Sequence, residues 1–110
     1  MPLLESSNDG QIPSTSQVAI VAAPSASIRR VVRYMVVNNR DASNITLTVA
    51  VKNGANVRHI CTAVIAPGFS WEFGDGNVIV LDSINKSVVA FLGNTPGTPA
   101  DFVTTYGDVS

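Results

Sequence analysis

Windows in which apolar and polar residues alternate with the two-residue period of β-strands are frequent along the chain. The clearest case is residues 44–52, where Ile45, Leu47, Val49 and Val51 are expected to face a core and the residues between them to face outward. Further strands are predicted at 17–22, 28–37, 57–65, 69–73, 78–81, 87–92 and 101–109. No window keeps the 3.6-residue period of an amphipathic helix, so the pattern predicts an all-β protein.

The spacing of these strands predicts two antiparallel sheets packed face to face. Turn-forming residues recur about every 8 to 12 positions, as in β-sandwiches. Asn53-Gly54 predicts a tight hairpin, because both residue types tolerate positive φ. About eight strands favour a jelly-roll-like sandwich, with an immunoglobulin-like sandwich as the alternative.

Residues 1–16 differ from the rest, because Ser, Asn, Asp, Gln and Thr dominate them. Such a segment buries too little apolar area to offset the entropy of ordering it. We therefore expect a flexible N-terminal arm over 1–16 and a β-sandwich domain over 17–110. The few apolar residues of this arm, Leu3, Leu4 and Ile12, are expected to contact a partner subunit.

Composition indicates a surface that is partly covered by other protein. Only 14% of residues are charged, well below the usual quarter, and the net charge is −1. No strong field directs the chain to nucleic acid or to an anionic membrane, and no apolar run is long enough to span a bilayer. We expect neither nucleic acid nor membrane as a partner.

The residue types that carry chemistry do not assemble into a predicted site. His59 and Cys61 lie two positions apart, which places them on one face of a strand, but no carboxylate lies nearby to orient the imidazole. The single cysteine permits no internal disulfide, and one His with one Cys cannot complete a four-ligand metal site. We expect no catalytic residue, no cofactor and no metal, and therefore no enzyme.

Three aromatic residues, Phe69, Trp71 and Phe73, are predicted to share one face of a strand. Buried, they would form the heaviest part of the core; exposed, they would form a ledge on which sugar rings stack. We favour the core.

The basic residues of the second strand are expected to divide between its two faces, with Arg29 and Arg33 on one and Arg30 on the other. This division disfavours a phosphate-binding patch. Arg29 and Arg33 are expected to contact acidic neighbours on a partner subunit. Tyr106 is expected at the rim, where its hydroxyl stays hydrated and can also touch a partner.

Four segments resemble the small β-sandwich virion structural proteins of tailed bacteriophages. They are the strand 27–38 ending in Asn, the alternating strand 45–49, the corner Ala66-Pro67-Gly68 followed by Glu72, and the closing strand 103–109. That group contains capsid decoration (cement) proteins and head–tail or tail-associated proteins, and it has no catalytic residues to carry over.

The resemblance implies a capsid decoration protein that stabilises the shell by bridging neighbouring subunits. Its partners would be the major capsid protein or other virion proteins, and it would form a homo-oligomer, for which a trimer is expected. It would be located in the virion, assembled in the host cytoplasm. A neck, tail or host-binding tip protein is an alternative, and a carbohydrate-binding module using Trp71 or Tyr106 is a third.

Overall fold

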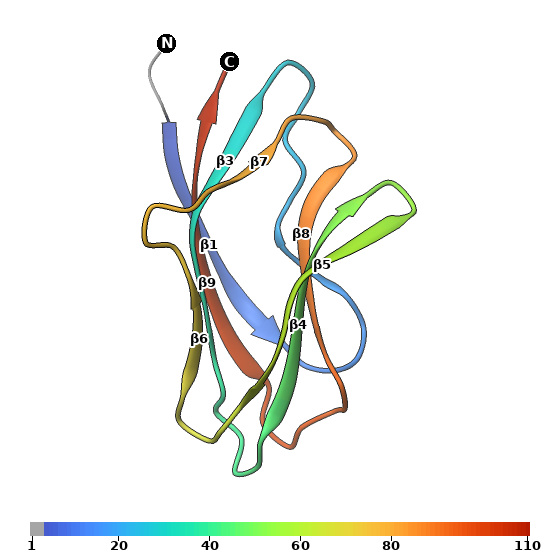
Figure 1. The fold of residues 1–110 in the computed structure, drawn as a ribbon, viewed down its shortest axis with the longest axis vertical. Coiled ribbons are helices and arrows are strands. Elements are labelled where there is room, and N and C mark those ends of the chain that lie inside the picture. Colours follow the sequence, from blue (N-terminus) through green and yellow to red (C-terminus); the bar gives the residue numbers. More distant parts are fainter. Residues whose placement is uncertain (1–3) are drawn as a thin grey trace.

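A computed structural model describes residues 4–110 and contains nine β-strands and no helix in that range (Figure 1). The strands are β1 (Leu4–Ile12), β2 (Val18–Val21), β3 (Arg29–Asn38), β4 (Ile45–Asn53), β5 (Asn56–Ile65), β6 (Ser70–Phe73), β7 (Ile79–Leu81), β8 (Lys86–Leu92) and β9 (Ala100–Val109). The predicted all-β class is confirmed.

The strands form two antiparallel sheets in jelly-roll order. One sheet has the order β1-β9-β3-β6, with β7 also paired to β3, and the other has the order β2-β8-β4-β5. The chain thus pairs from its ends inward: β1 with β9, β2 with β8, β3 with β6, and β4 with β5. This nesting is the jelly roll, so the immunoglobulin-like alternative is wrong.

Inward-facing side chains of both sheets fill the space between them. Ile45, Leu47 and Val49 are buried on β4 as predicted. Thr48 and Ala50 were expected to face solvent, but both are buried as well. On the outer side of β4, Phe91 pairs with Thr48 and His59 pairs with Ala50, and the two rings meet at a centroid distance of 6.1 Å. Large neighbours therefore cover the small residues of this central strand.

The hairpin of β4 and β5 confirms the turn predicted from Asn53-Gly54. Gly54 has φ +62°, a value that glycine adopts without strain, and the strands resume at Asn56. In Figure 1 the tip of this hairpin extends away from the body of the sandwich.

The expectation of a flexible arm over residues 1–16 is wrong for residues 4–12, which form β1. This strand pairs with β9 along its whole length, from Leu4 opposite Asp108 to Ile12 opposite Ala100. Low apolar content did not prevent folding, because backbone pairing with β9 requires no particular side chains.

Polar and small residues on the inner face of β1 make specific contacts with neighbouring strands. The Asn8 amide donates to the Ile20 carbonyl of β2 at 3.2 Å, and the buried Thr104 hydroxyl donates to the same oxygen at 2.9 Å. Gly10 leaves room for Phe102, since a Cβ atom there would lie 3.0 Å from the ring. The composition that resembled a disordered segment therefore fits this edge of the sandwich.

Candidate functional site

Two of the three apolar residues predicted to contact a partner, Leu4 and Ile12, lie in the described part of the chain, and they differ in exposure. Leu3 lies outside the described residues. Leu4 begins β1 and is 68% exposed, so its side chain is available to a partner. Ile12 is fully buried between the sheets, so its predicted role in partner contact is wrong. The alternation of β1 directs Ile12 inward, and pairing with Ala100 fixes it there.

Arg29 and Arg33 are both exposed. Arg29 is the first residue of β3, and Arg33 lies at an irregularity within this strand. The register of β3 against β9 shifts between Val32 and Tyr34, so Arg33 has no residue directly opposite it. Arg33 Nε lies 3.6 Å from Glu5 Oε1 of β1, an exposed ion pair that stabilises little. Both guanidinium groups remain accessible to a partner.

Arg30, by contrast, has a structural role. Its guanidinium forms a two-point ion pair with Asp108, at 2.8 and 3.0 Å, and donates to the Ala22 carbonyl at 2.8 Å. The hydrogen bond with Asp108 raises the pKa of Arg30. The guanidinium carbon lies 4.3 Å from the centroid of the Tyr106 ring. Tyr106 therefore packs between Arg30 and the core, and that face of its ring is not free to bind a sugar or a partner.

His59 and Cys61 do not share a face, contrary to the expectation from their spacing. A bulge at Ile60 shifts the register, so that Cys61 pairs with the inward-facing Val49 and His59 with Ala50. Cys61 packs against the core, and burial raises the pKa of its thiol. A nucleophilic Cys–His pair is incompatible with this arrangement, because the two side chains point to opposite sides of the sheet.

Acidic, His and Cys side chains do not cluster elsewhere among residues 4–110 in a group of three or more that could hold a metal ion. The same residues contain no helix long and apolar enough to cross a membrane.

The aromatic residues around β6 divide into two environments. Trp71 pairs with Val37 and Phe73 with Met35, and both rings pack against the core. Phe69 precedes the strand and is 68% exposed, so its assignment to the core is wrong. Its position directly after the Pro67-Gly68 turn was the signal, since residues in a corner need not follow the alternation of the next strand.

A buried asparagine builds the corner that holds Phe69. The Asn39 amide donates to the carbonyls of Ser43 and Ile65, each at 2.9 Å, and its side-chain oxygen accepts from the Asp41 amide at 2.8 Å. Its own backbone N–H donates to the Phe69 carbonyl at 3.0 Å, and its carbonyl accepts from Gly68 at 2.9 Å. This one residue joins the β3–β4 loop to the β5–β6 corner.

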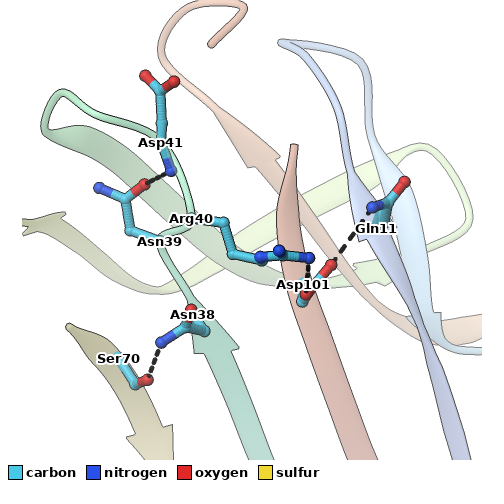
Figure 2. A network of polar contacts seen from close by, with 7 residues as sticks. All are labelled: Gln11, Asn38, Asn39, Arg40, Asp41, Ser70 and Asp101. Atoms are coloured by element: carbon cyan, nitrogen blue, oxygen red, sulfur yellow. Dashed lines mark hydrogen bonds and ion pairs between the residues drawn. The ribbon is translucent and has the colours of Figure 1, made fainter. Parts of the chain in front are cut away.

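Side chains around Asn39 extend the polar network across this end of the sandwich (Figure 2). Asn38 donates to the Ser70 hydroxyl at 2.8 Å, which joins β3 to β6. Asp101 accepts from Arg40 at 3.3 Å and from Gln11 at 3.4 Å, which joins the β3–β4 loop and β1 to β9. We interpret the network as a brace that fixes the loops at this end.

Beside this corner, a groove of about 320 Å³ lies between the edge strands β5 and β6. Ala63 and Ile65 of β5 line one wall, and Phe69 and Trp71 line the other. None of the residues that line it is charged. Such a groove suits an apolar side chain or an extended segment.

No protein-family model and no curated protein matches the sequence. A solved chain from Bacillus endospore appendages, which form a novel family of disulfide-linked pili, overlaps with a TM-score of 0.54 at 15% identity, covering 97% of this chain and 89% of that chain. A crystal structure of PirA overlaps with a TM-score of 0.51 at 16% identity, covering 92% of each chain.

A chain of the cyanophage Pam1 capsid asymmetric unit has a TM-score of only 0.37 at 14% identity, covering 99% of this chain and 84% of that chain. That overlap is too low to bear on fold or function. At the identities found for the other two structures, the similarity concerns the fold alone. The chain is therefore similar in fold to these two solved structures.

Proposed function

We propose that this protein is a structural component of a virion, and most specifically a decoration protein that binds a capsid shell. It works without chemistry: a rigid sandwich lies over junctions between shell subunits and holds them together through contact area. It would reside in the virion after assembly in the host cytoplasm. Its partners would be the major capsid protein or other virion proteins.

The observation that carries the proposal is the amount of apolar side chain left in solvent by so small a domain. Nine large hydrophobic residues of the described chain are exposed, among them Leu4, Val64, Phe69 and Ile84, each above 60%. Val64 and Phe69 lie together at the uncharged groove between β5 and β6, and a contiguous exposed apolar patch marks an interaction surface where scattered apolar residues do not. The low fraction of charged residues agrees with this.

The pilus chain supports an assembly role, because it has a similar fold and comes from appendages that form pili. The means of assembly must differ. This chain has a single cysteine, so it can form at most one disulfide with a neighbour and cannot build a continuous disulfide-linked fibre. Non-covalent contacts are therefore part of the proposal, and the expected trimer is not, because nothing in the described residues indicates a three-fold axis.

A carbohydrate-binding module is less well supported than it was from sequence. The Tyr106 ring is covered by Arg30 on one face, and Trp71 packs against the core. Tyr106 therefore presents no free face on which a sugar could stack, and Trp71 is half-buried, with only the part of its side chain that lines the groove accessible. A neck, tail or host-binding tip protein remains the alternative within the virion.

Antibody labelling of particles tests the position. An antibody against this chain should label intact virions and empty shells in electron micrographs and leave isolated tails unlabelled. Labelling confined to necks or tails would support the alternative and overturn the decoration role. Absence of label from every particle would overturn the virion proposal altogether.

A further inference from the structure

On one side of the sandwich, the edge strand β5 of one sheet lies beside the edge strand β6 of the other, and the two strands do not pair. β5 ends the four-stranded sheet and β6 ends the path of the five-stranded sheet, so within residues 4–110 no strand pairs with the outer side of β5. The corner that links them carries Phe69, and the uncharged groove lies between them. An edge strand beside an apolar groove can receive a further strand.

Only half of β5 carries the features that normally protect an edge. Arg58, His59 and the bulge at Ile60 occupy the half toward the hairpin tip, and charge and bulges both oppose edge-to-edge pairing. The other half, Cys61–Ile65, contains no charge, no proline and no glycine. This five-residue segment is therefore an open edge.

Exposed apolar side chains gather along the same edge. Ile60 lies at the bulge, Val64 is 68% exposed on β5, and Phe69 stands at the corner. The backbone of Phe69 is fixed, because its N–H donates to the Ala66 carbonyl at 3.1 Å and its carbonyl accepts from Asn39. An exposed aromatic ring on a fixed backbone loses little entropy on binding, which is typical of an interface anchor.

We propose that a second copy of this chain occupies this edge, with the two β5 strands paired antiparallel about a two-fold axis at Ala63. A two-fold axis places identical strands antiparallel, and this centre pairs the segment 61–65 with itself. Inward-facing residues then oppose inward-facing ones, with Cys61 opposite Ile65 of the second copy. On the outer face, Thr62 lies opposite Val64 of the second copy.

Charge and size favour a second copy as the occupant. The paired segments carry no charge, so identical strands do not repel each other. In this register Arg58 and His59 lie beside the Pro67-Gly68 corner of the second copy and away from its basic residues. The small side chains of Cys61 and Ala63 permit close approach of the backbones, and the four-stranded sheet continues into a sheet of eight strands.

The inference goes beyond the proposed function and does not depend on it. A self-associating chain need not bind a capsid, and a chain that decorates shells need not self-associate. Association of the purified protein is measured without shells, so failure of one proposal is distinguishable from failure of the other.

Sedimentation equilibrium of the full chain, from about 5 to about 500 µM, measures the association. We expect a reversible monomer–dimer equilibrium. Val64→Lys should weaken dimerisation at least tenfold, because it sets two ammonium groups beside the paired strands. Val103→Lys changes an exposed valine on the outer face of the other sheet and should leave dimerisation unchanged. Both substitutions lie at exposed positions, and equal melting temperatures at a concentration where wild type and variants are all monomeric confirm that both variants fold.

Cross-linking tests the register. In a Cys61→Ser background, Ala63→Cys places two thiols at the two-fold axis, where opposite Cα atoms of an antiparallel pair lie about 4.5 to 5.5 Å apart, within disulfide range. Mild oxidation should yield a covalent dimer in high proportion. Ile84→Cys in the same background, at an exposed site in the β7–β8 loop, should cross-link much less. Wild-type protein that stays monomeric throughout, or that dimerises while Val64→Lys has no effect and Ala63→Cys fails to cross-link, would overturn the proposal.

Discussion

At one end of this sandwich, the hydrogen bonds of a single residue, Asn39, fix the loop conformation, which the pattern of apolar positions does not specify. Asn39 is fully buried, and its amide and backbone together make five hydrogen bonds to the β3–β4 loop and to residues 65–69. A buried amide with satisfied donors and acceptors holds one geometry, because every alternative leaves a polar group unpaired. Asn39 thus determines where Phe69 stands.

Asn39→Ala should lower the free energy of unfolding by about 2 to 3 kcal/mol, because the Ile65 and Ser43 carbonyls lose their donor. Urea unfolding followed by Trp71 fluorescence measures the change. Asn38→Ala, which removes only the contacts of an exposed amide with Ser70 and Phe69, serves as the control and should cost less than about 1 kcal/mol. Equal losses in the two variants would contradict the role assigned to Asn39.

Cys61 should react slowly for a thiol of a small protein. Burial raises the pKa of its thiol, so at a given pH the thiolate is scarcer in the folded chain than in the unfolded one. The unfolded chain releases this proton at lower pH, so stability should fall as the pH rises from the unfolded pKa of the thiol to its raised folded pKa. Iodoacetamide alkylation across a pH series should therefore show a higher midpoint in buffer than in concentrated urea.

The Cys61→Ser variant provides the reference for this measurement, since its stability should lose the alkaline decline that belongs to the thiol. Identical alkylation midpoints for folded and unfolded chain would contradict the assignment of a buried thiol.

At the scale of elements, pairing partners decide what a segment becomes. β1 is rich in polar residues, yet it forms nine residues of strand because β9 offers a free edge and Ile12 enters the core. The bulges on β3 and β5 are likewise defined only by the pairing of each strand with its neighbour. The bulge on β3 leaves Arg33 without a paired residue, and the bulge on β5 turns His59 and Cys61 to opposite faces of the sheet.

Gly10→Val tests whether β1 is part of the folded domain. A side chain at this position meets the Phe102 ring at 3.0 Å, so we expect a loss of about 1 to 3 kcal/mol in the free energy of unfolding. Ser7→Val, at an exposed position of the same strand, should be neutral or slightly stabilising. A flexible arm would tolerate both changes equally, and thermal melts would then coincide.

At the scale of the whole molecule, one apolar layer between two sheets supplies the stability. Leu47 lies in that layer and is fully buried. Leu47→Asp should cost more than about 4 kcal/mol, which is enough to unfold most domains of this size, because an unpaired carboxylate would lie among apolar side chains. Circular dichroism and solubility measure the outcome.

Thr46→Asp provides the matched control, since it introduces the same carboxylate one position away, on the outer side of the same strand. It should cost about 1 kcal/mol and leave the fold intact. A folded, soluble Leu47→Asp variant would contradict the two-layer core.

The pattern of residues by itself determined the class of this protein, eight of the nine strands of the described residues to within one residue, and the β4–β5 hairpin. It also predicted most of the core, because which face a strand residue occupies is a local property.

Only the tertiary structure decided the strand order, the strand at the N-terminus, the two bulges and the exposure of Phe69. Each of these depends on which backbone edge meets which other edge, a relation between segments as distant as Leu4 and Asp108. No local period records that relation. The open edge of β5 belongs to the same class: a strand is an edge only because no other strand of the described chain reaches it.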